Sequence, residues 1–295
     1  MTVSLARHSG FCFGVRRAIQ LALDAAQGGQ EIFTLGELIH NPQYVQQMAD
    51  LGIKVVPSAA DIHDSIVVIR SHGITKSELQ QLTDNGNTII DATCPYVSRT
   101  HDLVREAVTS GIQVLILGDP KHPEVIGMHS YGDQDTLVVA PGDEIPKLRD
   151  NRLCVISQTT QTIENLNDLV SKLLPDLLEL RVFNTICLAT SQRQQASACL
   201  AKNSDLMVVI GGRHSSNTRM LARLCAQYTE TIHVETEAEL KAEDVMGRQN
   251  IGLAAGASTP EETIVSVYNK IIKINGELDA VTRISEIPLF KEESC

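Results

Sequence analysis

The stretch Val-Val-Ile-Arg-Ser-His-Gly-Ile-Thr at residues 67–75 runs from a continuous apolar segment into small and polar residues. Two later stretches have the same character: Cys-Val-Ile-Ser-Gln-Thr-Thr-Gln-Thr at 154–162 and Gly-Leu-Ala-Ala-Gly-Ala-Ser-Thr-Pro at 252–260. A pattern of this kind is typical of a buried parallel strand that leads through a short turn into a helix. Its recurrence predicts a fold made of repeated α/β domains.

Similar apolar runs and amphipathic stretches alternate along the rest of the chain. Alternation of strand-like and helix-like segments predicts an α/β protein with parallel sheets. One apolar stripe at helical spacing consists of Val15, Ala18, Ile19, Ala22 and Ala26. The expected strands are 66–69, 88–90, 114–117, 137–139, 154–156, 206–210 and 251–254.

Three cysteines mark the repeat. Cys12, Cys94 and Cys187 each stand where a helix is expected to begin, and the intervals between them are 82 and 93 residues. These intervals predict three pseudo-symmetric α/β domains. The predicted ranges are 12–93, 94–186 and 187–275, followed by a C-terminal tail at 276–295.

The same offset from each cysteine reaches a polar loop. Counting 28 residues onward leads to His40, His122 and Ser215. The carboxyl ends of parallel strands form the ligand-binding edge of α/β sheets. We therefore expect three cysteines and three polar loops to lie around a common centre.

The composition excludes several classes of protein. The 295 residues include 25 Lys and Arg against 36 Asp and Glu, a formal net charge of −11, and 43% are hydrophobic. These proportions suit a globular core rather than a disordered acidic tail. With 3% aromatic residues and no Trp, the chain lacks the usual features of a nucleic-acid-binding protein. No apolar run reaches the roughly 18–20 residues of a membrane-spanning helix and no signal peptide is evident, so we expect a cytoplasmic protein.

Three thiolates from three domains are suited to one metal centre. They fill three corners of a tetrahedral zinc site or bind a cubane iron–sulfur cluster. A structural cluster usually takes four cysteines, so three leave one iron open to a substrate. The alternative is that these cysteines are buried thiols at equivalent positions of a repeated fold. Structural roles are expected for the other four, Cys154, Cys199, Cys225 and Cys295.

A set of neutral or weakly basic hydrogen-bond donors lies in the polar loops. Gathered at strand ends and helix N-termini, such donors suit a phosphate or diphosphate, which an acidic protein must bind locally rather than through its overall charge. The chain has no P-loop and no G-x-G-x-x-G signature at a strand–helix turn, which disfavours a nucleotide. The donors are His40, His72, His122, Ser215, Ser216, Asn217 and Ser258.

Glu124 is the candidate acid beside these donors. Because proline disfavours helix at the preceding residue, we expect His122-Pro123-Glu124 to be extended. Residues two apart in an extended chain point to the same side. His122 and Glu124 would then face one pocket, as anion donor and proton source. The alternative is a solvated loop carboxylate.

The chain resembles the 4-hydroxy-3-methylbut-2-enyl diphosphate reductase family, whose members catalyse the last step of the methylerythritol phosphate (non-mevalonate) route to isoprenoids. The matching motifs follow the family's order over nearly the whole chain and are far more specific together than singly. Two positions depart from the family pattern. Leu188 stands where a tyrosine is common, and Arg213-His214 stands where a Lys-Asn-type pair is more usual. Neither is a ligand position. The motifs are Phe-Cys-Phe-Gly-Val-Arg-Arg-Ala-Ile (11–19), Gly-Glu-Leu-Ile-His-Asn-Pro (36–42), Arg-Ser-His-Gly (70–73), Asp-Ala-Thr-Cys-Pro (91–95), His-Pro-Glu-Val (122–125), Ser-Gln-Thr-Thr (157–160), Asn-Thr-Ile-Cys-Leu-Ala-Thr-Ser-Gln-Arg-Gln (184–194), Ser-Ser-Asn-Thr-Arg (215–219) and Ala-Gly-Ala-Ser-Thr-Pro (255–260).

The resemblance implies a trefoil of three α/β domains around a [4Fe-4S] cluster held by Cys12, Cys94 and Cys187. It implies that the donors named above bind the substrate diphosphate. Glu124 would donate a proton together with Thr159, which also belongs to the substrate-binding set. The implied reaction is a two-electron reductive dehydration of 4-hydroxy-3-methylbut-2-enyl diphosphate to isopentenyl and dimethylallyl diphosphates. A ferredoxin or flavodoxin would supply the electrons, and neither a nucleic acid nor a membrane is implied as a partner.

Two other classes of function are compatible with the residues alone. A non-redox protein that binds a phosphometabolite would use the three cysteines for zinc. Such a protein would be colourless and would lack acid-labile sulfide. A phosphohydrolase is a third hypothesis, although no carboxylate pair with metal-site spacing supports it.

Overall fold

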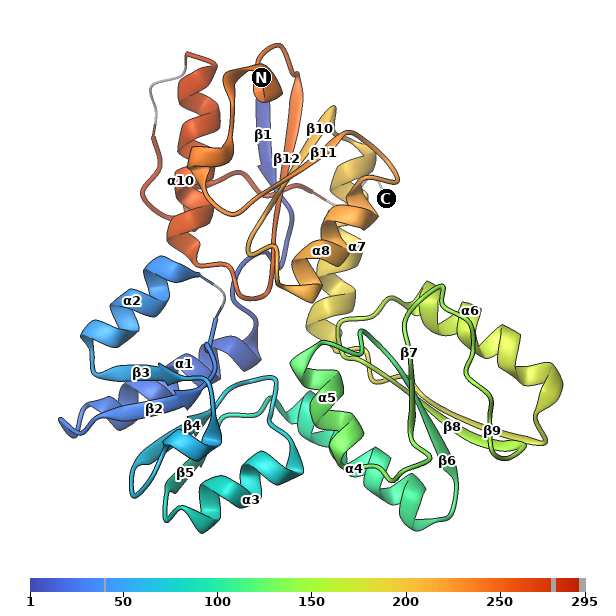
Figure 1. Cartoon of the computed structure of the whole chain (residues 1–295). Helices are drawn as coiled ribbons and strands as arrows, with labels where there is room; N and C mark the ends of the chain where they lie inside the picture. Colours follow the sequence, from blue (N-terminus) through green and yellow to red (C-terminus); the bar gives the residue numbers. More distant parts are fainter. Residues whose placement is uncertain (40, 277–279, 292–295) are drawn as a thin grey trace. The chain divides into compact units, whose positions relative to one another are not determined.

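The computed structural model describes residues 1–39, 41–276 and 280–291. Its strands form three four-stranded parallel sheets, which we call sheets A, B and C (Figure 1). The strand order is β11-β10-β12-β1 in sheet A, β3-β2-β4-β5 in sheet B and β7-β6-β8-β9 in sheet C. The strands are β1 (Thr2–Leu5), β2 (Ile32–Leu35), β3 (Ile53–Val56), β4 (Ile66–Ile69), β5 (Thr88–Asp91), β6 (Gln113–Leu117), β7 (Leu137–Val139), β8 (Arg152–Ser157), β9 (Glu179–Phe183), β10 (Leu206–Ile210), β11 (Thr231–Val234) and β12 (Asn250–Ala255).

Helices connect these strands. The α-helices are α1 (Phe13–Ala26), α2 (Pro42–Asp50), α3 (Lys76–Asp84), α4 (Pro95–Thr109), α5 (Pro123–Ser130), α6 (Ile163–Leu173), α7 (Leu188–Lys202), α8 (Ser216–Cys225), α9 (Ala242–Val245) and α10 (Glu261–Ile274). Short 3₁₀ helices are η1 (Ala59–Asp61), η2 (Leu174–Asp176), η3 (Glu237–Glu239) and η4 (Ile284–Glu286). Across the described ranges, no helix has the length and apolar character needed to span a bilayer.

The three sheets repeat one strand order. In each sheet the first strand of the repeat (β2, β6 or β10) lies between the second and the third, and the fourth strand forms the far edge. This repetition confirms the predicted class, an α/β protein with three parallel-sheet domains. The exact domain ranges stay a prediction. The fourth strand of sheet A is β1, which lies outside the range 187–275 and comes before Cys12.

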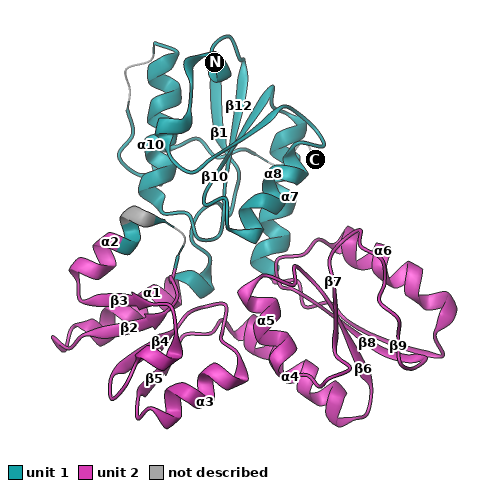
Figure 2. Cartoon of the chain, viewed as in Figure 1, with its two compact units in different colours: residues 1–15, 39–45, 188–295 teal, residues 16–38, 46–187 magenta. Residues whose placement is uncertain are grey.

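The chain groups into two compact units (Figure 2). The first unit comprises residues 1–15, 39–45 and 188–295 and contains sheet A. The second unit comprises residues 16–38 and 46–187 and contains sheets B and C. Each unit has its own hydrophobic core.

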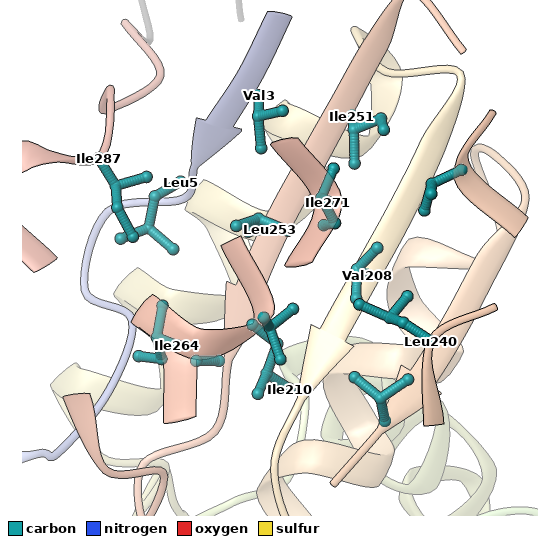
Figure 3. Packing of buried hydrophobic residues seen from close by; sticks show 14 of the residues in the cluster. Val3, Leu5, Val208, Ile210, Leu240, Ile251, Leu253, Ile264, Ile271 and Ile287 are labelled. Carbon is teal, nitrogen blue, oxygen red and sulfur yellow. The ribbon is translucent and has the colours of Figure 1, made fainter. Parts of the chain in front are cut away.

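Sheet A carries buried apolar side chains on both faces, as a covered parallel sheet does. Val208 and Ile210 of β10 belong to one cluster with Ile264 of α10 (Figure 3). Met207 and Val209 alternate with them along the strand and pack on the other face with residues of α7 and α8. Burying each such side chain stabilises the fold by roughly 1.5–3 kcal/mol.

Sheet C in the second unit is also covered on both faces. Ile116 of β6 packs with Val104 of α4 and Val125 of α5. Leu115, its neighbour on the strand, packs with Leu169 of α6 on the opposite face. Helix α4 therefore leaves sheet B at the end of β5 and covers sheet C, so the residue at its start lies where the chain passes from one sheet to the next.

The seven strands expected from apolar runs are confirmed to within two residues at each end. The predicted helical stripe is confirmed as the buried side of α1, with Ala26 half-buried and the other four buried. Part of the C-terminal tail continues sheet A: the N–H of Leu5 donates to the carbonyl of Pro288 at 2.7 Å, and the N–H of Phe290 donates to the carbonyl of Leu5 at 3.0 Å.

Candidate functional site

Each of the three marked cysteines stands directly before a helix, as predicted. Cys12 precedes α1, Cys94 is the N-cap of α4, and Cys187 precedes α7. All three are half-buried thiols. A helix N-terminus favours a negatively charged group. At Cys12 this preference is visible as a hydrogen bond: the backbone N–H of Val15 donates to Sγ at 3.5 Å.

One hydrogen bond recurs at all three cysteines. The backbone N–H of each donates to a carbonyl in the loop that follows the neighbouring strand, two residues beyond the end of that strand. The bond therefore ties each cysteine to the turn after the third strand of its sheet. The pairs are Cys12 with Ala257, Cys94 with Ser71 and Cys187 with Thr159, each at 3.0 Å.

Two predicted histidines meet in the second unit. His72 follows β4 of sheet B, and His122 follows β6 of sheet C. Their ring centroids are 5.4 Å apart and the ring planes meet at 84°, an edge-to-face arrangement. The carboxyl ends of two different sheets thus contribute side chains to one place.

The role of His122 as a helix cap decides which of its ring nitrogens carries the proton. It is the N-cap of α5, and its Nδ1 accepts the backbone N–H of Glu124 at 3.2 Å. A ring nitrogen that accepts a hydrogen bond carries no proton, so the proton of the neutral ring lies on Nε2. Nε2 of His122 is therefore a hydrogen-bond donor, which suits an anion.

The predicted extended conformation of residues 122–124 is confirmed at His122 and wrong at Pro123 and Glu124. His122 is extended, with φ −77° and ψ 134°, but α5 begins at Pro123 and includes Glu124. Proline favours the first helical position because its φ is already near the helical value and its missing N–H would have no partner there. The two residues are neighbours because one caps the helix that holds the other.

Glu124 is a buried acid, and the alternative of a solvated loop carboxylate is wrong. Only 1% of the residue is exposed. The N–H of Thr159 donates to its Oε1 at 2.6 Å and the Thr159 hydroxyl donates to its Oε2 at 2.9 Å. Burial raises the pKa of Glu124 to about 7, although both hydrogen bonds from Thr159 act to lower it. A carboxyl group with this pKa can act as a proton donor near neutral pH.

These contacts form a continuous path through the second unit between two of the cysteines. Each step is a backbone hydrogen bond, a side-chain hydrogen bond, a ring contact or a peptide link. The path brings two cysteine loops, two anion donors and one buried acid into the same region. Its residues, in order, are Cys94, Ser71, His72, His122, Glu124, Thr159 and Cys187.

The sequence analysis assigned no role to Gly118 or to Gln158, although Gln158 lies within the motif at 157–160. Both residues shape the loop that carries His122. A Cβ on Gly118 would lie 2.6 Å from Cγ2 of Val125, so glycine lets α5 approach the end of β6 closely. Oε1 of Gln158 accepts the N–H of Asp119 at 3.1 Å. The available signal for Gln158 was its place just after a predicted strand.

The first unit gathers the predicted serines at the ends of two neighbouring strands. Ser215 is the N-cap of α8, and its Oγ accepts the N–H of Thr218 at 3.3 Å. A Cβ on Gly256 would clash with Oγ1 of Thr218, so the loop after β12 lies against the first turn of α8. Ser258 is half-buried in the second of these loops. The carbonyl that accepts the Cys12 N–H belongs to the residue before Ser258.

Asn217 is the clearest sign of a ligand in the first unit. It follows Ser216 in the first turn of α8 and is 5% exposed. Its Nδ2 is buried and has no hydrogen-bond partner in the part of the chain that the structure describes. Leaving a buried polar group unpaired costs about 1–3 kcal/mol. Because a helix N-terminus favours an anion, a phosphate oxygen fits as the missing acceptor.

Cys199 is a buried residue of α7. The other predicted residues divide into two groups. His40 and Cys295 lie outside the described residues. Burial raises the pKa of Cys154 to about 11 and that of Cys225 to about 12, as expected for structural thiols. Within residues 1–39, 41–276 and 280–291, no group of three or more His, Cys, Asp or Glu side chains is placed to hold a metal ion. The cluster ligands therefore stay a prediction.

A model of the LytB protein family matches residues 3–272 of the chain. The chain belongs to the LytB family. Similar relatives of this LytB chain are the 4-hydroxy-3-methylbut-2-enyl diphosphate reductases of Trichlorobacter lovleyi, Pelobacter propionicus and Geobacter sulfurreducens, each 42% identical to it. The matches cover 93%, 93% and 92% of this chain and 99%, 99% and 97% of the relatives.

Two solved structures resemble the LytB chain. One is a structure of (E)-4-hydroxy-3-methyl-but-2-enyl diphosphate reductase, the terminal enzyme of the non-mevalonate pathway, with 37% identity and a TM-score of 0.66, covering 92% of this chain and 100% of the other. The other is the E-1-hydroxy-2-methyl-but-2-enyl-4-diphosphate reductase from Plasmodium falciparum, with a TM-score of 0.86 over 98% of this chain and 95% of the other; its 24% identity supports the fold alone. The predicted family and its assignment to the oxidoreductases are confirmed.

Proposed function

We propose that this LytB chain reduces 4-hydroxy-3-methylbut-2-enyl diphosphate in the non-mevalonate pathway. Relatives with that activity in their names match the chain over almost its full length, which supports the proposal. In the overall reaction, two electrons and two protons remove the substrate hydroxyl as water and yield isopentenyl and dimethylallyl diphosphates. As the family resemblance implies, a ferredoxin or flavodoxin is the electron donor.

Cys12, Cys94 and Cys187 are the proposed ligands of a [4Fe-4S] cluster. Cysteine thiolates are the usual ligands of such clusters, and three of them leave one iron without a protein ligand. The donor set fits the group because the three thiols are half-buried, stand at helix N-termini and are anchored by the same backbone bond. When bound, the cluster would pass electrons from the donor protein to the substrate and would offer a Lewis-acid position for the substrate hydroxyl.

The diphosphate is proposed to bind to the hydrogen-bond donors that the family resemblance implies. Two donors support this assignment: the Nε2–H of His122, and the Nδ2 of Asn217, which has no hydrogen-bond partner among the described residues. Both are suited to phosphate oxygens. Clamping the diphosphate fixes the position of the hydroxyl at the far end of the substrate. The proposed set is His40, His72, His122, Thr159, Ser215, Ser216, Asn217 and Ser258.

Glu124 is the proposed proton donor, with Thr159 as its partner. At a pKa of about 7 the carboxyl is protonated in a substantial fraction of molecules at neutral pH. When protonated, Glu124 donates to the Thr159 hydroxyl oxygen 2.9 Å away, and that hydroxyl then has its own proton to pass on. After transfer, the two hydrogen bonds from Thr159 stabilise the carboxylate.

The path from Cys94 to Cys187 carries the proposal, because it joins two predicted ligand loops to the anion donors and the acid. Anaerobic purification followed by iron, zinc and acid-labile sulfide assays tests it. We expect a brown protein with about four sulfides per chain that bleaches in air. A colourless protein with bound zinc and no sulfide would contradict the proposal and favour a non-redox phosphometabolite-binding protein.

A further inference from the structure

Arg17 of α1 binds the loop that carries Cys94. Its Nη1 donates to the carbonyl of Thr93 at 3.2 Å, and its Nη2 donates to the carbonyl of Asp91, also at 3.2 Å. These carbonyls lie one and three residues before Cys94. The arginine is half-buried and belongs, with the loop, to the second unit.

The rest of this loop is fixed by the side chain of Asp91 and by sheet B. Oδ1 of Asp91 accepts the N–H of Thr93 at 2.8 Å. The N–H of Ala92 donates to the carbonyl of Ile69 at 3.1 Å. These bonds take up N–H groups, whereas the guanidinium of Arg17 takes up carbonyls. Arg17 thus donates hydrogen bonds to the carbonyl groups of the loop, while other partners accept from the loop's N–H groups.

Arg193 of α7 has the same relationship to Cys12. Its Nη2 donates to the carbonyl of Gly10, two residues before Cys12, at 2.8 Å. Its Nη1 donates to the carbonyl of Ala189 in its own helix at 3.3 Å. Arg193 is 2% exposed, and these residues all belong to the first unit.

The two arginines occupy similar places in the repeat, one helix position apart. Arg17 lies five residues after Cys12, and Arg193 lies six residues after Cys187, each in the second turn of the helix that follows its cysteine. The loop that each arginine binds leads to a cysteine other than the one that precedes its own helix: Arg17 donates to carbonyls just before Cys94, and Arg193 donates to a carbonyl just before Cys12. A guanidinium keeps its charge when buried and presents its N–H groups as a rigid fork, so it fixes carbonyls more firmly than a flexible ammonium does.

The corresponding arginine of the third helix provides a contrast. Arg99 lies five residues after Cys94 but is exposed and pairs with Glu106 of its own helix, with Nη1 and Oε1 2.9 Å apart. An arginine five residues after a cysteine therefore does not always bind a cysteine loop. Arg99 offers a control matched in residue type, helix position and distance from a cysteine.

We propose that Arg17 and Arg193 are positioning residues that hold the loops of Cys94 and Cys12 in the conformation that binds the cluster. The inference rests on the proposed function, because it takes both cysteines as cluster ligands. Mutation of groups that orient metal ligands typically weakens metal binding 10–100-fold. A positive charge near a ligand thiolate also favours the more negative, reduced form of a cluster, so its removal lowers the reduction potential.

The test measures cluster retention and potential rather than turnover. Arg17→Gln, Arg193→Gln and the matching lysine variants are purified anaerobically, and iron release to a chelator is timed. We expect release about tenfold faster or more in the glutamine variants and intermediate rates in the lysine variants. The reduction potential, followed by electron paramagnetic resonance, should fall in the glutamine variants. Arg99→Gln should match the wild type in both measurements.

Wild-type iron release and potential in Arg17→Gln and Arg193→Gln would overturn the inference. Where a glutamine variant does not fold, the lysine variant decides: faster release supports the inference and an unchanged rate overturns it. A wild-type protein that binds no iron and sulfide would instead contradict the proposed function, so the two failures are distinguishable.

Discussion

Thr159 binds both oxygens of the Glu124 carboxyl group, through its N–H to Oε1 at 2.6 Å and its hydroxyl to Oε2 at 2.9 Å. The carbonyl of the same threonine accepts the N–H of Cys187 at 3.0 Å. One residue therefore connects the buried acid to a cysteine loop. Thr159 therefore links the acid to the loop that is proposed to carry a cluster ligand.

Glu124→Gln should abolish most turnover without loss of the cluster. Glutamine keeps the shape of the side chain and can still accept from the Thr159 N–H, but it has no proton to give. Loss of a general acid typically slows the reaction by about 10²–10⁴-fold. Turnover with a chemical reductant is measured beside iron and sulfide content. Glu164→Gln, in the exposed first turn of α6, is the control and should keep wild-type activity. Undiminished turnover in Glu124→Gln would remove this residue from the mechanism.

Burial of Glu124 should also make stability depend on pH. The pKa rises from 4.5 to about 7 on folding, so between these pH values the folded protein binds more protons than the unfolded chain. The free energy of unfolding therefore falls as pH rises through this window, by roughly 3 kcal/mol in total. Urea unfolding of the apoprotein at pH 4.5 and pH 8 measures the change. Glu124→Gln should lack this component, and equal pH dependence in both proteins would contradict the assigned burial.

Cys94→Ser should lower the bound iron sharply, because a serine hydroxyl is a poor ligand for an iron–sulfur cluster. Iron, sulfide and visible absorbance after anaerobic purification give the readout. Cys225→Ser is the matched control: this thiol is fully buried in a hydrophobic cluster of the first unit, so the change should reduce stability and leave iron content unchanged. Wild-type iron content in Cys94→Ser would show that the ligand assignment is wrong.

Asn217→Leu should weaken substrate binding without weakening the fold. The buried Nδ2 makes no hydrogen bond to the described residues, so the free protein loses none when the amide is replaced by an apolar group of similar size. A hydrogen bond to a charged phosphate is worth about 1.5–3 kcal/mol, which corresponds to a rise in KM of roughly 10–150-fold. Steady-state kinetics and a thermal melt distinguish the two effects. An unchanged KM with a lowered Tm would mean that Asn217 is structural.

The buried strands could be predicted from the sequence, whereas several edge strands could not. The β10 run, Leu-Met-Val-Val-Ile, is apolar throughout because helices cover both faces of its sheet. The edge strand β9, Glu-Leu-Arg-Val-Phe, is half-buried to exposed and has no such run. The edge strand β1 could not be assigned to sheet A, because the strand that it pairs with, β12, is distant in the chain. The edge strands β3 and β11 and the four-residue central strand β2 were also missed.

Local patterns placed the site residues on their elements but did not fix their surroundings. The cysteines could be assigned to helix N-termini because a helix-like stretch follows each of them directly in the chain. The burial of Glu124 depends on Thr159, 35 residues away, and on a helix that begins at Pro123. The bonds of Arg17 to Thr93 and of Arg193 to Gly10 span 76 and 183 residues, and no local pattern encodes them.

Product analysis is the direct test of the proposed reaction. The anaerobically purified protein is incubated with 4-hydroxy-3-methylbut-2-enyl diphosphate and reduced methyl viologen, and the isoprenoid diphosphates are separated and quantified. We expect isopentenyl and dimethylallyl diphosphates in proportion to the electrons consumed, with one product molecule formed for every two electrons. Recovery of unreacted substrate from a protein with its full iron and sulfide content would contradict the proposed reaction.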